Sequence, residues 1–216
     1  MKRSALPLFG LVVLLATGCS YKAPVDSVQN INVYSSYEGK IEGAFDLIIN
    51  IDPGLAQRDI TPSSYICTMY HFPVDVQASV RSSVYSATEK VFEQINERTD
   101  IPSRENMKRE GKSGYIIVRL KEFEPSLYFT QGFFTVTAHA SCESGIEVEI
   151  RNKDNTKVFE TAVTGNRSSS GDGGMRCGGG AEVLADAVKK SFRESLERYV
   201  ERLSTTAKLR EHFSRK

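Results

Sequence analysis

The chain has 216 residues, of which 40% are hydrophobic and 25% are charged, and its formal net charge is +1. These proportions are ordinary for a globular protein with one hydrophobic core, and they exclude a wholly disordered chain. Binding of nucleic acid requires a basic surface, and 28 basic against 27 acidic residues leave almost no excess from which to build one. We therefore expect no nucleic-acid partner.

The first residues are typical of an exported protein. Met1-Lys2-Arg3 precedes an apolar run from Ala5 to Ala16, and the small residues Thr17-Gly18 follow it. A charged start, an apolar stretch of roughly a dozen residues and a small-residue cut site define a signal peptide. The run is too short for a membrane-spanning helix, which needs about 20 residues. The sequence predicts a signal peptide over residues 1–18.

The cysteine directly after this segment completes a four-residue motif that is similar to one in a known family. Ala16-Thr17-Gly18-Cys19 resembles the lipobox of bacterial lipoproteins, with Ala16 in place of the usual Leu. The resemblance implies cleavage before Cys19 and attachment of lipid, palmitate included, to that residue. Because an Asp after the lipidated cysteine retains such proteins in the inner membrane, Ser20 implies anchorage in the outer membrane, facing the periplasm. Residues 19–38 would form a lipidated tether and residues 39–216 a single α/β domain.

Hydrophobic periodicity predicts the elements of that domain. Alternation with a period of two indicates strands, and spacings of three and four indicate helices with one apolar face. The expected strands are 45–51, 64–72, 115–129, 133–150 and 156–166, with a kink at Ser144-Gly145. The expected helices are 75–95 and a longer one carrying Leu184, Val188, Phe192, Leu196, Tyr199 and Leu203, preceded by a flexible loop at 168–174.

These elements predict an α/β (α+β) fold, a two-layer sandwich in which two amphipathic helices cover one face of a largely antiparallel sheet. The order of the elements resembles the small lipoproteins of Gram-negative envelopes that assist lipid transport or lipopolysaccharide assembly. What the resemblance implies is a non-enzymatic role in the cell envelope, because a shared fold does not transfer a reaction.

No catalytic or metal-binding constellation is evident. The three histidines, His71, His139 and His212, have no nearby serine in a G-x-S-x-G elbow and no C-x-x-C pair. The glycine-rich run that begins at Gly171 places Arg176 where a dinucleotide fingerprint needs its third glycine. We expect no enzyme activity, no metal and no cofactor.

Three cysteines remain after Cys19, so in an oxidising compartment two can pair and one is left over. A hairpin turn at 153–156 brings Cys142 opposite Arg167, from which Cys177 is within reach of the chain. We therefore expect a disulfide between Cys142 and Cys177, with Cys67 as the odd thiol. The alternative pairing is Cys67 with Cys142, both on expected strands.

The hairpin near residue 130 gathers large apolar side chains. If Tyr128 pairs with Phe133 across the turn, one flank of residues 133–142 has no sequential neighbour. Either an early strand such as 45–51 fills that flank, or it is an open edge available for strand addition by a partner. We expect this tip to bind a protein or lipid partner; the alternative is that its rings cap the core. The expected partner-binding residues are Phe123, Leu127, Tyr128, Phe129 and Phe133.

Two functions remain open at this point. One is a non-enzymatic outer-membrane lipoprotein that acts as a binding or scaffold component of an envelope assembly, with an envelope protein as its partner. The other is a periplasm-facing carrier of a lipid or other apolar ligand.

Overall fold

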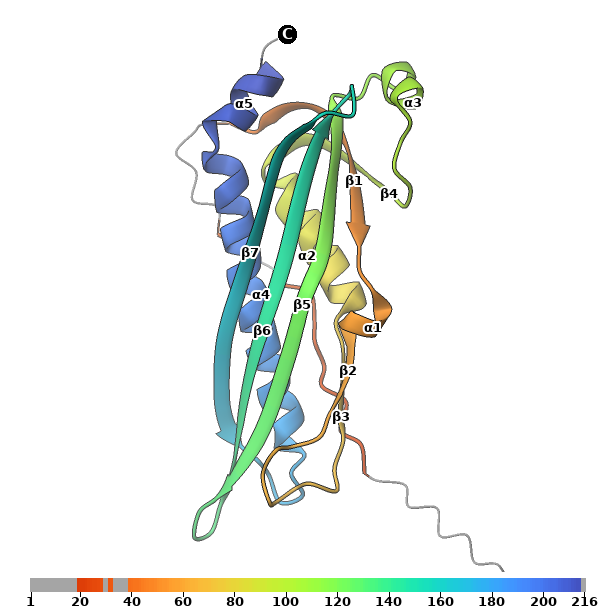
Figure 1. The fold of residues 1–216 in the computed structure, drawn as a ribbon. Helices are drawn as coiled ribbons and strands as arrows, with labels where there is room; N and C mark the ends of the chain where they lie inside the picture. Colours follow the sequence, from red (N-terminus) through yellow and green to blue (C-terminus); the bar gives the residue numbers. More distant parts are fainter. Residues whose placement is uncertain (1–18, 29–30, 33–38, 215–216) are drawn as a thin grey trace, which may run out of the picture.

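The computed structural model describes residues 19–28, 31–32 and 39–214; the expected signal peptide lies outside the described residues, as does most of the stretch from 29 to 38. Two long helices and three long strands dominate the fold (Figure 1). The strands are β1 (Ile41–Asn50), β2 (Gln57–Ile60), β3 (Phe72–Asp75), β4 (Phe92–Arg98), β5 (Gly114–Gln131), β6 (Val136–Asn152) and β7 (Lys157–Asp172). The helices are α1 (Pro53–Ala56), α2 (Gln77–Glu89), α3 (Arg104–Arg109), α4 (Gly179–Thr205) and α5 (Ala207–Ser214).

The main sheet has five strands in the order β4-β1-β5-β6-β7, and β2 pairs with β3 in a second, small sheet. The strands β5, β6 and β7 are antiparallel, whereas β1 runs parallel to both of its neighbours. The parallel pairings require crossovers, and α2 supplies the one between β1 and β4. The mixed α/β class is confirmed; the two parallel pairings were not expected.

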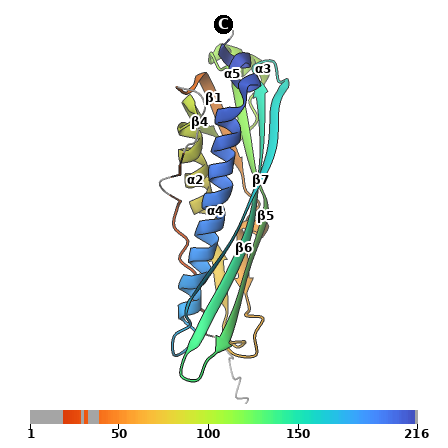
Figure 2. The same ribbon diagram turned by 90° about the vertical axis from the view of Figure 1, so that its left-hand side faces the viewer.

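The long helix α4 lies along the strands β5 to β7, and α2 lies beside it on the same side of the sheet (Figure 2). The predicted apolar face of α4 is buried over its whole length, from Leu184 to Leu203. The inner face of β6 consists of even-numbered residues from Ala138 to Ile150, as the alternation predicts. Spacings of three and four residues place the apolar side chains of α4 on one face of the helix, and alternation places those of β6 on one face of the sheet. These two apolar faces pack against each other in one core.

A β-bulge lies in β5 between Leu120 and Glu122, opposite Gly145 of β6. The irregularity expected at Ser144-Gly145 of β6 is therefore found opposite these residues, in β5. A bulge adds one residue, so it exchanges the faces of the strand that follows. Before it, even-numbered residues such as Val118 face the core; after it, odd-numbered residues such as Phe123 do.

Three predicted boundaries are wrong. The first long helix ends at Glu89, and the following residues form β4 instead of further helical turns. The expected strand 64–72 is mostly a loop between β2 and β3. The expected loop 168–174 is largely strand, since β7 continues to Asp172.

The longer β7 also removes the expected open flank. Residues 137–142 of β6 pair with β7 on one side and with β5 on the other. The hairpin closes with Gln131 opposite Val136, so Tyr128 faces His139 and not Phe133. The register brings Cys142 opposite Arg167, as predicted.

A buried polar seam joins α4 to the sheet. The hydroxyl of Ser144 on β6 lies 2.8 Å from those of Ser191 and Ser195 on α4. Ser191 also donates to the carbonyl oxygen of Gly165 on β7, at 2.9 Å, and Ser195 to that of Ser144, at 3.0 Å. All three serines are fully buried, so these hydrogen bonds compensate for their lost hydration.

Candidate functional site at the Cys19 end

The first described residues are bound to the folded body instead of forming a tether. Cys19 is exposed, and its carbonyl oxygen accepts the N–H of His71 at 3.2 Å. The N–H of Tyr21 donates to the His71 carbonyl at 2.8 Å, and that of Ala23 to the Pro73 carbonyl at 3.0 Å. These bonds extend the small β2–β3 sheet by a parallel segment. The expected tether is thus corrected for residues 19–23, because main-chain hydrogen bonds hold them against His71 and β3.

Side chains of the same segment are packed into the body. The Tyr21 ring lies 5.5 Å from that of Tyr70 and 5.9 Å from that of Phe72, between ring centres. Val28 is buried, and its N–H donates to the hydroxyl of Ser83 on α2 at 2.8 Å. The position of Cys19 is therefore fixed with respect to the domain.

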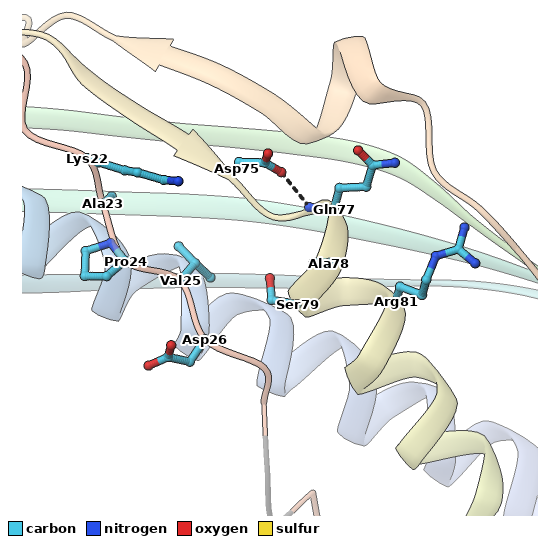
Figure 3. A pocket seen from close by; sticks show the side chains of 10 residues that line it. All are labelled: Lys22, Ala23, Pro24, Val25, Asp26, Asp75, Gln77, Ala78, Ser79 and Arg81. Atoms are coloured by element: carbon cyan, nitrogen blue, oxygen red, sulfur yellow. Dashed lines mark hydrogen bonds between the residues drawn. The ribbon is translucent and has the colours of Figure 1, made fainter.

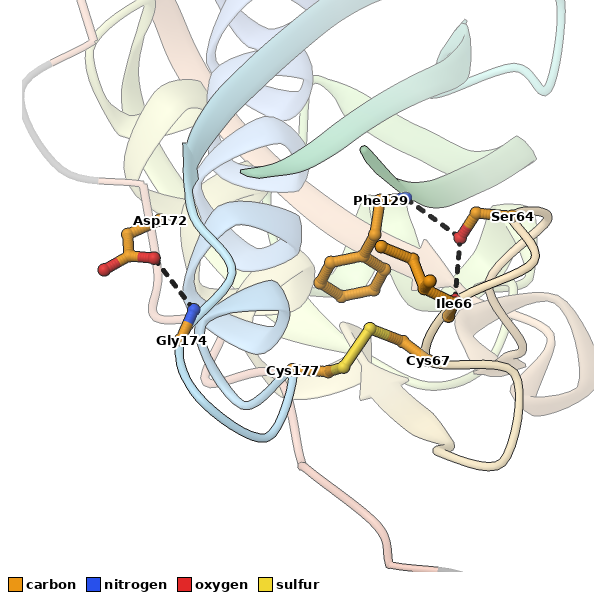
Figure 4. The surroundings of a disulfide bond; sticks show 7 residues. All are labelled: Ser64, Ile66, Cys67, Phe129, Asp172, Gly174 and Cys177. Carbon is orange, nitrogen blue, oxygen red and sulfur yellow. Dashed lines mark hydrogen bonds between the residues drawn. A yellow bond between two sulfur atoms is a disulfide. The ribbon is translucent and has the colours of Figure 1, made fainter. Parts of the chain in front are cut away.

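A disulfide closes this end of the molecule, and it joins Cys67 to Cys177 (Figure 4). It links the loop between β2 and β3 to the turn before α4, across 110 residues of sequence and with the two Cα atoms 6.0 Å apart. Beside it, the hydroxyl of Ser64 accepts the N–H of Phe129 at 3.0 Å and donates to the Ile66 carbonyl at 2.9 Å. The loop between β2 and β3 is thereby held both to the turn before α4 and to the end of β5.

The predicted pairing of Cys142 with Cys177 is wrong. Since β7 stays paired with β6 as far as Thr137 and Asp172, Cys177 lies beyond that end of the strand. Five residues of strand separate Cys142 from Thr137, which is about 17 Å at the usual rise per residue. Cys142 is instead a free, buried thiol on the inner face of β6, and burial raises its pKa to about 12.

The expected partner-binding residues divide into two groups. Phe123, Leu127 and Phe129 are buried, because the bulge turns the odd-numbered residues of β5 toward α4, so they are core residues and this part of the prediction is corrected. Tyr128 is 46% exposed and stacks on His139, with the ring centres 4.7 Å apart. Phe133 is 91% exposed in the hairpin turn. A binding role for these last two remains a prediction.

A groove of about 810 Å³ runs between the N-terminal segment and the start of α2. Figure 3 shows Lys22 and Asp26 on the segment, Asp75 at the end of β3 and Arg81 on α2, with polar ends that do not converge on one point. The Asp75 carboxylate already accepts the N–H of Gln77 at 3.0 Å. Charged groups on several sides do not suit an apolar ligand, and the groove brings no nucleophile to a base.

The histidines lie apart from one another. His71 contacts Asp59 at 3.1 Å, His139 contacts the hydroxyl of Thr130 at 3.0 Å, and His212 lies 3.4 Å from the side chain of Asn152. In the part of the chain that the structure describes, no group of three or more His, Cys, Asp or Glu side chains could hold a metal ion. Within the same residues, no helix is both long enough and apolar enough to cross a bilayer.

A network of charged side chains lies on the outer face of the sheet. On the outer face of the sheet, Arg119 contacts Glu147 at 2.8 Å and Glu149 at 3.2 Å, and Arg151 contacts Glu149 at 2.5 Å. Burial alone would raise the pKa of each carboxyl, but hydrogen bonds from the neighbouring cations hold the pKa of Glu147 and of Glu149 below the ordinary value. These groups are already paired, which indicates a structural role.

A scan against known protein families finds no match, and a search of curated proteins finds no similar sequence. Among solved structures, the chain is similar to a hypothetical protein from Chlamydia trachomatis, with 10% identity over 74% of this chain and 96% of that one and a TM-score of 0.41. It is also similar to a neuraminyllactose-binding hemagglutinin homolog from Helicobacter pylori, with 10% identity, coverage of 85% and 96%, and a TM-score of 0.44. A minor lipoprotein from Acinetobacter baumannii matches at 9% identity, with coverage of 74% and 87% and a TM-score of 0.35. These TM-scores are too low to carry an assignment of function.

Proposed function

We propose that this chain is a non-enzymatic lipoprotein of the outer membrane, anchored through Cys19, that serves as a binding or scaffold component of a periplasm-facing assembly. The observation that carries the proposal is the position of Cys19. It follows the lipobox-like run directly, its side chain is exposed, and its main chain is hydrogen-bonded to the folded body. Acyl chains on this residue would anchor a rigid two-layer α/β body, with almost no slack between lipid and protein.

Two features favour the scaffold role over the carrier role: side chains pack together between β5 and α4, and charged residues line the groove. Between β5 and α4, the rings of Phe123 and Phe192 are in contact, with their centres 5.7 Å apart. The groove beside the N-terminal segment has Lys22, Asp75 and Arg81 on its walls. An acyl chain requires an apolar cavity, since burying charged groups beside it without partners is unfavourable.

Substitution of single cysteines tests the anchor. Cys19→Ser should leave the protein unacylated and move it out of the membrane fraction of intact cells. Cys142→Ser is the matched control, because it changes a buried thiol outside the lipobox-like run and should leave fractionation unchanged. Sedimentation of unacylated Cys19→Ser with the outer membrane would contradict the proposal.

The scaffold and carrier roles are separated by what the acylated protein retains. A scaffold should bring down an envelope protein after crosslinking in intact cells, whereas native mass spectrometry of a carrier should show a bound ligand of defined mass. Recovery of such a ligand in a one-to-one ratio, with no crosslinked protein, would favour the carrier.

A further inference from the structure

Exposed apolar side chains are gathered at one end of the molecule. Among the described residues, six of the seven large hydrophobic side chains that are exposed lie in or beside three loops at this end. The first loop joins β2 to β3, the second joins β5 to β6 and the third joins β7 to α4. The six are Tyr65, Met69, Tyr128, Phe133, Phe134 and Met175, and we call them the anchor-end surface. The seventh, Ile101, lies in the loop between β4 and α3, in the opposite half of the molecule (Figure 1).

The three loops form one rigid unit. The disulfide between Cys67 and Cys177 joins the first loop to the third. The N–H of Ser63 donates to the Leu127 carbonyl at 3.1 Å, and the N–H of Gly173 to the Val136 carbonyl at 2.7 Å, so both loops are also bound to the β5–β6 hairpin. The hairpin tip and the loops lie together at the same end in both views (Figures 1 and 2). Clustered exposed apolar residues on a fixed framework indicate a contact surface.

Charged side chains are sparse in the loops at this end, although Lys22, Asp172 and Glu182 lie close to them. Segments 61–70, 125–142 and 173–181 together contain one charged side chain, Arg176, although a quarter of the whole chain is charged. On the outer face of the sheet, charged pairs are replaced by uncharged pairs toward the tip. Toward the tip, Ser126 pairs with Ser141, whereas farther from it Glu124 pairs with Glu143. Apolar side chains with few charged neighbours can enter the bilayer interface without taking a charge out of water, so the sparse charge in these loops fits contact with lipid.

The anchor lies at the same end. The carbonyl of Cys19 accepts the N–H of His71, and the Tyr21 ring packs on that of Tyr70, at the end of the loop between β2 and β3. A lipid on Cys19 therefore cannot reach the bilayer without bringing the anchor-end surface to it. We infer that this surface inserts its side chains into the interfacial layer of the membrane that holds the anchor, which fixes the orientation of the body. The inference rests on the proposed lipid anchor.

Exposed aromatic side chains suit this layer, where amphipathic and aromatic rings accumulate, and a second contact strengthens attachment by an acyl anchor. The rings of Phe133 and Phe134 stand edge to face at the tip of the hairpin, with their centres 4.5 Å apart. A membrane is favoured over a protein as the occupant because the position of Cys19 places lipid, and not another chain, beside this surface.

Tryptophan fluorescence tests the inference directly, since the chain contains no tryptophan. Phe133→Trp places a single reporter at the tip, and Ile101→Trp places a matched reporter at an exposed apolar position far from it. Each full-length variant is produced in cells, purified from membranes and reconstituted into vesicles of phosphatidylethanolamine and phosphatidylglycerol, with and without brominated acyl chains. Mass spectrometry of the same samples records the acyl groups on Cys19.

We expect brominated lipid to quench the tryptophan of Phe133→Trp at least twofold and to leave that of Ile101→Trp unchanged. Equal, weak quenching of both reporters in acylated protein would overturn the inference and leave the proposed anchor intact. Absence of acyl groups on Cys19 would overturn both. Loss of a crosslinked envelope protein on changing Phe133 and Phe134 to Ser, together with an unquenched reporter, would assign the surface to a protein partner instead.

Discussion

Replacement of Gly165 by alanine probes the contact between α4 and the sheet. An alanine Cβ at this position would lie 2.2 Å from the carbonyl oxygen of Ser191 and 2.9 Å from the main-chain nitrogen of Ser195. Both atoms belong to the backbone of a long helix, so no side-chain rotation can relieve the overlap. The helix must move away from β7 by about an ångström to reach ordinary contact distance.

The expected cost follows from what that movement disrupts. Overpacking of a core by one methyl group usually costs about 1–3 kcal/mol. Moving α4 also lengthens the bonds of Ser191 to Gly165 and of Ser144 to Ser195, each worth about 1 kcal/mol. Together these give a loss of about 3–5 kcal/mol in the free energy of unfolding. For a domain of this size, that is a fall in Tm of roughly 6–20 °C.

Thermal unfolding followed by circular dichroism, with urea unfolding at 25 °C, measures this loss. Gly171→Ala is the matched control on the same strand, because its Cβ would meet the side chain of Val183, at 2.9 Å, and no helix backbone. The control should lose less than half as much stability. A Gly165→Ala variant within about 0.5 kcal/mol of wild type, at the level of an unremarkable surface change, would refute the packing of α4 against β7.

Three further predictions concern sulfur and charge. Cys67→Ser should lower the free energy of unfolding by about 2–4 kcal/mol, because the disulfide closes a long loop of the unfolded chain; non-reducing peptide mapping should join Cys67 to Cys177, and recovery of any other pair would contradict the structure. In the acylated protein, Cys142 should not react with Ellman's reagent until the chain unfolds, since its thiol is buried and its pKa is raised; fast labelling of folded protein would show that the core is open there. Because the pKa of Glu147 and of Glu149 is lowered in the folded state, their contribution to stability is present above the unfolded value of 4.5 and is lost as the pH falls through the folded values. The urea midpoint should therefore fall in acid, and Glu149→Gln should flatten that fall; an unchanged profile would count against the ion pairs.

The parts of the fold that the sequence predicted best are those in which one pattern runs unbroken through one element. Six apolar residues of α4 and the even-numbered residues of β6 keep their phase over many turns and pleats, so their buried faces could be read directly. The strand β4 could not be predicted in this way. Val91 and Ile95 continue the spacing of Ala87 as if the helix went on, and neither glycine nor proline marks the end of α2 at Glu89.

The sequence of β5 carries a signal that assigns some of the tip residues to the core. The residues of β5 that enter the main core are even-numbered from Ile116 to Leu120 and odd-numbered from Phe123 to Phe129. A change of phase within one strand is the mark of a bulge, and it assigns Phe129 to the core. The disulfide had no comparable signal. Cys67 lies in a loop without periodicity, and its distance from Cys177 depends on how three loops pack.

The length of the strands has a consequence for any partner. β6 has 17 residues, which at the usual rise corresponds to about 55 Å from the tip to the turn before β7. If the anchor-end surface rests on the bilayer, the helices α3 and α5 stand roughly that far above it, because they lie at the other end of the same rigid strands (Figure 1). A partner that binds there must itself extend about 50 Å from the membrane or come from the periplasm, whereas a partner confined to the membrane can meet only the anchor-end surface.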